Sequence, residues 1–282
     1  MKILRKILPF IGIFLFLYLI SKLSWEQFFI ALQNLELYKV LLCALLCLCG
    51  IFLKGLRWKS CFLRQYYQYP LFSVFFAAVY YGLVTPGRMG ELLKIGFLKD
   101  LGFGMKQAVY LTLYDRFFDL FYLVIAACLG ISLFYPPSTP VVIIALVGIV
   151  VVLAVQRASM AMFLGYMQSP SRFLWQWFLT TLAYFVYAMG LSVLLRVEHF
   201  QEFYRSVLAV WTGNFIALIP ISIHGLGTRE AVYLKFLHWL TPEEIVLASL
   251  AHFVLAVCIN LIFCSFFLSR VSELAPQDSS PE

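Results

Sequence analysis

Long apolar runs are the feature that most constrains this chain. A transmembrane helix needs about 20 mostly apolar residues, and six runs approach or exceed that length: residues 3–23, 38–57, 107–135, 141–155, 173–195 and 245–268. Lys, Arg, Asp and Glu make up only 12% of the 282 residues, about half the roughly 25% of a soluble domain. The composition therefore excludes a soluble enzyme, a fibrous repeat and a disordered chain, and it predicts an all-α polytopic membrane protein.

Two further apolar segments are interrupted by proline, glycine and charge. Residues 71–84 run into Thr85-Pro86-Gly87-Arg88-Met89-Gly90-Glu91 before the apolar character resumes at 92–98. Residues 206–219 run into a second break at 220–230 and resume at 231–240. Unpaired backbone groups are costly in hydrocarbon, so each break must face protein or a wet cavity. We therefore expect two re-entrant helical hairpins, each of which enters and leaves on the same side.

The distribution of Lys and Arg indicates the orientation. With a cytoplasmic N-terminus, six full spans and two re-entrant hairpins, fourteen of these residues lie on or toward the cytoplasmic side and six toward the other, with Arg116 inside the membrane. This bias follows the positive-inside rule and predicts that both termini are cytoplasmic. In this arrangement Arg57, Trp58 and Lys59 anchor a helix end at the cytoplasmic headgroups.

The same topology makes the two hairpins enter from opposite sides, which is the arrangement expected of an inverted repeat. Two unrelated helix breaks would give the same pattern.

The first apolar run is followed by no small-residue cleavage site, so it is interpreted as a retained helix rather than a signal peptide. These features favour the cytoplasmic (inner) membrane of a prokaryote.

Three charges lie well inside the run at 107–135. At a rise of 1.5 Å per residue, Asp115 lies about 12 Å and Asp119 about 18 Å along the helix. Each unpaired charge near a helix centre costs about 2.5–3.5 kcal/mol, so these side chains must be paired or hydrated. Arg116 and Asp119 are three residues apart and are expected to meet on one face, which leaves Asp115 to find another partner. The sequence predicts an interhelical ion pair, a polar gate or a proton-coupled carboxylate beside a cavity, or a combination of these.

The first break has the residue types of a phosphate site. A helix that restarts after Gly90 would present free N–H groups and a positive dipole end, and Arg88 just before it adds a bidentate cation. Gly87 and Gly90 permit close approach and positive φ. Glu91 suits a helix start, but it could instead pair with Arg88 and leave no anion site.

The second break repeats this pattern, with Arg229 and Glu230 in the first turn of the returning helix. Its candidate residues for binding a headgroup are His224, Gly225, Gly227, Arg229 and Glu230. His224 titrates near neutrality in water, although a single histidine is more often simply hydrogen-bonded. Asn214 and His252 are weaker candidates.

No cofactor and no metal are expected. Asp, Glu and His are few and scattered, no nucleophile has an adjacent base, and no nucleotide-binding loop is present. Six of the seven cysteines lie in apolar runs without metal-ligand spacing alongside a histidine, and we interpret them as small buried hydrophobes. These six are Cys43, Cys47, Cys49, Cys128, Cys258 and Cys264.

Four short motifs occur in order along the chain: Gly55-Leu56-Arg57-Trp58, the first break from Thr85 to Glu91, Asp115-Arg116-Phe117-Phe118-Asp119, and His224-Gly225-Leu226-Gly227-Thr228-Arg229-Glu230-Ala231. Together they resemble the flippase-like membrane domain of bacterial lysylphosphatidylglycerol synthases, which also exists as stand-alone proteins, and the resemblance covers roughly residues 5–268. The family usually has Pro-Gly-Gly at both breaks. Here Arg88 replaces a small residue in the first, and Ile223-His224 stands where Pro-Gly is expected in the second, which leaves the headgroup preference open.

The resemblance implies that the chain moves a lipid, often an anionic or isoprenoid-linked one, between the two leaflets. We expect one transmembrane domain over residues 1–268 and a short polar cytoplasmic tail over 269–282. That tail is too short for an aminoacyl-transferase domain, so the chain is not expected to be a lysyl-lipid synthase itself. The expected partners are the membrane and a lipid with a phosphate headgroup, with no nucleic acid.

Two alternatives stay open. A membrane-embedded transferase acting on a lipid phosphate would need a general base, for which Glu91, Glu230 or His224 could serve. A non-catalytic partner subunit of a lipid-modifying enzyme would turn its helix breaks toward another protein.

Overall fold

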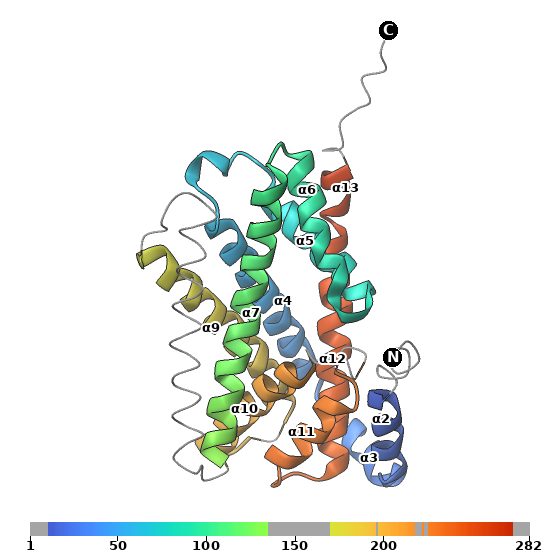
Figure 1. Cartoon of the computed structure of the whole chain (residues 1–282). Helices are drawn as coiled ribbons and strands as arrows, with labels where there is room; N and C mark the ends of the chain where they lie inside the picture. Colours follow the sequence, from blue (N-terminus) through green and yellow to red (C-terminus); the bar gives the residue numbers. More distant parts are fainter. Residues whose placement is uncertain (1–10, 135–169, 196, 218–221, 223–224, 273–282) are drawn as a thin grey trace, which may run out of the picture.

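The computed structural model describes residues 11–134, 170–195, 197–217, 222 and 225–272, and the regular elements within these ranges are all helical. Four long helices form the bundle in Figure 1: α4 (Leu37–Ser60), α7 (Met105–Phe134), α9 (Pro170–Leu194) and α12 (Pro242–Ser265). The shortest of them have 24 residues, which corresponds to about 36 Å and exceeds the hydrocarbon thickness of roughly 30 Å.

Three helices in the described part of the chain are long and apolar enough to cross a membrane: Leu37–Ser60, Ser171–Leu194 and Pro242–Ser265. A fourth span is possible if α2 (Ile11–Ser21) and α3 (Trp25–Gln33), which meet at 92°, are one broken span. The chain is therefore an integral, helical membrane protein, as predicted, while the count of six spans stays a prediction. The predicted span at 141–155 lies outside the described residues, as does the first part of the span at 3–23.

The distribution of side chains is that of a protein surrounded by lipid. Large apolar side chains are exposed along the outer helices, among them Leu41 and Phe266, which are 62% and 71% exposed. The charged side chains of Arg57, Lys94 and Glu230 are instead fully buried. Apolar groups outside and charges inside are stable only where the surroundings are hydrocarbon and the interior pairs the charges.

The first predicted hairpin is present. Helix α5 (Leu71–Val84) ends at Thr85, whose extended backbone is the conformation favoured before Pro86. The 3₁₀ segment η3 (Pro86–Leu93) then folds back along α5, and α6 (Lys94–Asp100) returns to the end of the bundle where α5 began (Figure 1). Gly90 makes this fold-back possible, because a Cβ there would lie 2.3 Å from the carbonyl carbon of Tyr81.

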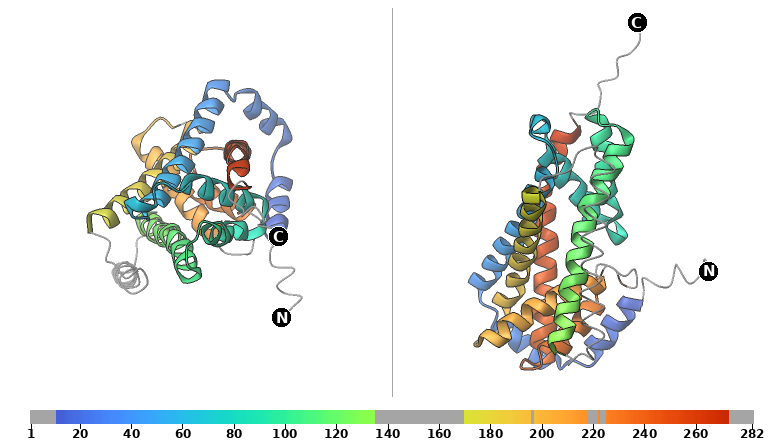
Figure 2. Two further views of the ribbon diagram at one scale, coloured as in Figure 1. Left: turned by 90° about the horizontal axis from the view of Figure 1, so that it is seen from above. Right: turned by 60° about the vertical axis from the view of Figure 1, so that its left-hand side comes forward.

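A second helical pair lies at the opposite end of the bundle, as Figure 1 and the right view of Figure 2 show. It consists of α10 (Phe200–Ala217) and α11 (Thr228–Phe236), which pack against each other. Gly225 and Gly227 before α11 have positive φ values of 84° and 81°, which only glycine adopts at no steric cost. The two helical pairs therefore lie at opposite ends of the bundle, while re-entrant entry of each pair and the inverted repeat stay predictions.

Each hairpin has its own apolar core, and α4 contributes to both. The first core joins α5 and α6 to the later half of α4 and to α7, through residues such as Trp58, Phe75 and Tyr114. The second joins α10 and α11 to the earlier half of α4, to α9 and to α12, through residues such as Cys43 and Tyr233. The short elements η2 (Arg64–Tyr66) and α13 (Leu268–Ser272) complete the described chain.

We expect Gly90→Ala to destabilise the protein by about 1–3 kcal/mol or more, because the new methyl group overlaps backbone atoms that cannot rotate away. The matched control is Gly96→Ala in the same hairpin, where a Cβ meets no atom within 4 Å and the loss of backbone freedom is expected to be neutral or slightly stabilising. Thermal unfolding of both purified variants in detergent measures the difference. Equal midpoints for the two variants would contradict the close packing of η3 on α5.

Candidate functional site

A buried guanidinium joins α4 to α7. Arg57 of α4 is fully buried and donates from Nη2 to Oδ1 of Asp115 at 2.7 Å, and from Nη1 to Oδ1 of Asp119 at 2.9 Å. A further bond of 3.2 Å joins Nη2 to Oδ2 of Asp119. Asp115 and Asp119 are four residues apart on α7 and therefore lie on one face of the helix, so a single planar guanidinium binds both carboxylates.

Each carboxylate in this region has a second cation. Lys94 Nζ lies 2.6 Å from Asp115 Oδ2, and Lys54 Nζ lies 3.3 Å from Asp119 Oδ1. Arg116 pairs with Glu91 at 2.7 Å. We call these seven side chains the ion cluster: Lys54, Arg57, Glu91, Lys94, Asp115, Arg116 and Asp119. With four cations and three carboxylates, the ion cluster carries a net charge of +1.

The ion cluster has a closed side and an open side. The side chains of Arg57, Lys94 and Asp115 are at most 1% exposed, whereas those of Lys54 and Asp119 are 17% exposed and that of Arg116 is 26% exposed. The closed side holds the helices together by charge-assisted hydrogen bonds in a dry interior. On the open side, the excess positive charge of the ion cluster is exposed to the surroundings of the bundle.

The pairing differs from the one expected along the helix. The sequence predicted that Arg116 and Asp119 meet, but Arg116 pairs with Glu91 of η3, while Asp119 pairs with Arg57 and Lys54 of α4. Glu91 pairs with Arg116 and, at 3.5 Å, with Lys94. The interhelical contacts are preferred because the facing helices supply cations at closer range than the next turn of α7 does.

The expectation that Arg57 and Trp58 anchor a helix end at the headgroups is wrong. Both side chains are fully buried, and the indole Nε1 of Trp58 donates to the carbonyl oxygen of Leu71 at 3.0 Å. Lys54, Arg57 and Lys94 therefore leave the cytoplasmic charge count, which falls from fourteen to eleven. Buried Arg229 leaves the opposite count, which falls from six to five, so the asymmetry persists.

Sequence reasoning missed Lys54, Arg57 and Lys94 as partners of the aspartates. One signal was available: Lys54 and Arg57 lie three residues apart within an apolar run, on the same face of a helix. Two carboxylates inside one predicted span required cations on another, and this pair was the nearest match.

At the first break, Arg88 has a left-handed backbone with φ 55° and an exposed side chain. Non-glycine residues pay about 1–2 kcal/mol for this conformation. Its carbonyl oxygen accepts a hydrogen bond from Arg116 Nη2 at 3.2 Å, which connects the break to the ion cluster. Gly87 lies beside it in η3.

The expected helix start after Gly90 is not formed. The Gly90 N–H donates to Oγ1 of Thr85 at 2.7 Å, and the regular helix α6 begins only at Lys94. The backbone of η3 follows the close contact with α5, so no α-helix starts at Gly90, and the exposed cation of this break is the Arg88 side chain.

At the second break, Arg229 and Glu230 face into the protein. Arg229 is 3% exposed and donates to Glu230 at 2.8 Å and to the hydroxyl of Ser249 on α12 at 3.2 Å. The other carboxylate oxygen of Glu230 accepts the Gly227 N–H at 2.6 Å, and the Ser249 hydroxyl completes the set by donating to Glu230. Gly225 accommodates the turn, and His224 lies outside the described residues.

Two tyrosines of α9 lie close to other candidate residues. The ring centroid of Tyr187 lies 4.5 Å from that of His252. One turn away, the Lys54 ammonium lies 4.0 Å from the centroid of the Tyr184 ring. Sequence reasoning missed both tyrosines, because aromatic residues are so frequent in this chain that no single one stands out.

The chain matches a family described as the lysylphosphatidylglycerol synthase TM region over residues 6–264. This range covers most of the chain and all four motifs, so the predicted resemblance is confirmed. A search of curated proteins finds no match. The match supports a function connected with membrane lipids.

Arg57→Leu is expected to cost about 3–5 kcal/mol of stability, because it leaves the Asp115 and Asp119 carboxylates short of their shared partner. The matched control on the same helix is Lys39→Leu, which removes an exposed pair with Glu36 and is expected to cost no more than about 1 kcal/mol. Thermal unfolding in detergent compares the two.

A second substitution tests whether the cost arises from the stranded charge. Adding Asp119→Asn to Arg57→Leu is expected to restore part of the lost stability, so that the two effects are not additive. Additive losses would show that Arg57 acts through packing alone.

Proposed function

This chain belongs to the lysylphosphatidylglycerol synthase TM region family, and we propose that it is a lipid flippase. Its substrate would be an anionic phospholipid or an isoprenoid-linked lipid, which it would move between the leaflets. The observation that carries this proposal is the excess positive charge on the open side of the ion cluster, where the carbonyl oxygen of the exposed Arg88 of the first helix break accepts a hydrogen bond from Arg116.

The charge of the site favours a phosphate headgroup. The ion cluster has one cation in excess, and the exposed Arg88 beside its open side adds another. Phosphate oxygens accept bidentate hydrogen bonds from a guanidinium, while lipid tails remain among the exposed apolar side chains of the bundle. A neutral or cationic headgroup would gain nothing from this excess.

Two hairpins from opposite ends fit alternating access, in which one repeat rocks against the other around a central site. Arg116 connects the moving parts, because it belongs to α7 and binds both Glu91 and the Arg88 carbonyl of η3. Moving the first hairpin relative to α7 between the two states would break these bonds while Arg57, Asp115 and Asp119 keep α4 and α7 together. In this proposal Arg88, Gly87, Gly90 and Glu91 of the first break and His224, Gly225, Gly227, Arg229 and Glu230 of the second form the headgroup site. Asp115, Arg116 and Asp119 form the gate.

Residues 1–268 would act as one transmembrane unit in the cytoplasmic membrane of a prokaryote, with both termini in the cytoplasm. A lipid synthase is a suitable partner, since it would supply the lipid to be moved. A transferase activity is less well supported, because Glu91 and Glu230 are both held in ion pairs and are poor general bases in that state.

The experiment is leaflet transfer by the purified protein in liposomes that contain headgroup-labelled phospholipids or a polyprenyl phosphate, read with an impermeant quencher. We expect Arg88→Gly to slow transfer at least about tenfold, because a charge-assisted hydrogen bond contributes about 1.5–3 kcal/mol. Glycine also relieves the positive φ of this residue, so stability should not fall. The matched control is Lys99→Gln, which removes an exposed cation from α6 of the same hairpin.

Undiminished transfer by the Arg88→Gly variant would show that Arg88 does not bind the headgroup. If the wild type transfers none of these lipids, with or without a proton gradient, the flippase proposal fails and the partner-subunit and transferase alternatives gain weight.

A further inference from the structure

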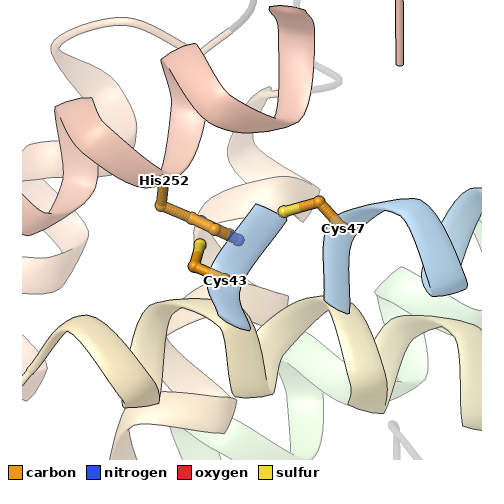
Figure 3. Close-up of side chains that lie close together, drawn as sticks. All are labelled: Cys43, Cys47 and His252. Carbon is orange, nitrogen blue, oxygen red and sulfur yellow. The ribbon is translucent and has the colours of Figure 1, made fainter. Parts of the chain in front are cut away.

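Three buried side chains outside the ion cluster meet where α4 packs against α12. Cys43 and Cys47 are four residues apart on α4 and share one face of it, and His252 reaches them from α12 (Figure 3). All three side chains are 0% exposed. The two sulfur atoms and a ring nitrogen of His252 all lie within 4.8 Å of one another.

One ring nitrogen of His252 is hydrogen-bonded and the other is not. Its Nε2 lies 3.1 Å from the carbonyl oxygen of Tyr187. A carbonyl only accepts, so Nε2 carries the proton and Nδ1 keeps a free lone pair. Nδ1 is buried and has no hydrogen-bond partner within the described part of the chain. The nitrogen on the side of the thiols is Nε2, since a Cβ on Gly190 would lie 3.1 Å from Nε2 and 3.4 Å from the Sγ of Cys43. An ion bound there would replace the bond to Tyr187, and the ring proton would move to Nδ1.

We propose that Cys43, Cys47 and His252 bind one Cu(I) ion. Thiolate and imidazole are the ligands that soft ions prefer. Within the described ranges the group contains three ligands, whereas structural zinc sites almost always have four. Bonds of about 2.0–2.3 Å to N and S place neighbouring ligand atoms of a three-coordinate ion about 4 Å apart. Small side-chain rotations would bring the three ligand atoms, which lie within 4.8 Å of one another, to this separation.

Binding would release the two thiol protons, because metal ligands must be deprotonated. Two thiolates and one Cu(I) carry a net charge of −1. The bound ion would fasten α4 to α12 beside Tyr187, whose ring centroid lies 4.5 Å from that of His252. It would therefore stabilise the packing of α12 against α4.

The test uses the full chain, purified in detergent under reducing, oxygen-free conditions and titrated with Cu(I) alone against a chromophoric Cu(I) chelator. We expect one Cu(I) per chain, and an X-ray absorption spectrum with two sulfur ligands and one nitrogen ligand. Cys43→Ser and Cys47→Ser should each weaken binding at least about tenfold. The matched control is Cys49→Ser, on the same helix but with an exposed side chain, which should bind like the wild type.

The spectrum of the wild type keeps the test decisive even where a variant fails to fold. Folded wild type that binds less than one equivalent, or a copper shell without nitrogen, would overturn the proposal. Stoichiometric binding that survives Cys43→Ser would overturn it as well. A site that takes one Zn(II) in a separate titration and no Cu(I) would show that the assignment to copper is wrong.

Discussion

One arginine in the interior determines how the helices of this protein are placed. A charged side chain in hydrocarbon costs several kcal/mol unless it is paired, and Arg57 is fully buried. Its planar guanidinium requires two carboxylates on one face of a neighbouring helix, which Asp115 and Asp119 of α7 provide. Asp115 in turn requires Lys94, which lies at the start of α6. The chain of pairs thus fixes α4, α7 and the returning arm of the first hairpin relative to one another.

These ion pairs leave the ion cluster with one positive charge in excess. The position of this charge matters more than its magnitude. On the closed side, Arg57, Lys94 and Asp115 each have an ion-pair partner at 2.6–2.7 Å. The more exposed cations, Lys54 and Arg116, lie on the other side, where Arg116 also binds the carbonyl oxygen of the exposed Arg88. A structural ion pair needs no excess cation. A site that binds and releases an anion does need an excess cation. That cation must be held in place by groups that already have their own ion-pair partners.

The sequence predicted the elements of this fold better than their partners. Apolar runs and breaks containing proline and glycine specify helices and hairpins locally, so the first break at residues 85–91 and the second near Gly225 were found. Ion pairing is not local. Arg116 and Asp119 were expected to meet because they are close in sequence, yet Arg57 lies 62 residues from Asp119 and binds it. The meeting of Cys43, Cys47 and His252 was missed for the same reason, since only helix packing brings α12 to α4.

The two breaks are similar in sequence, but their arginines differ in exposure and bonding. This difference bears on how a flippase of this kind would work. In the first, Arg88 is exposed and its backbone is strained. In the second, Arg229 is enclosed and bonded to Glu230 and Ser249. Two equivalent half-sites around one centre cannot both be open if access alternates. The described conformation therefore corresponds, under the proposed function, to the state that accepts a headgroup at the first hairpin. In the transition to the other state, the Arg116–Glu91 bond would break and Arg229 would be released from Glu230 and Ser249.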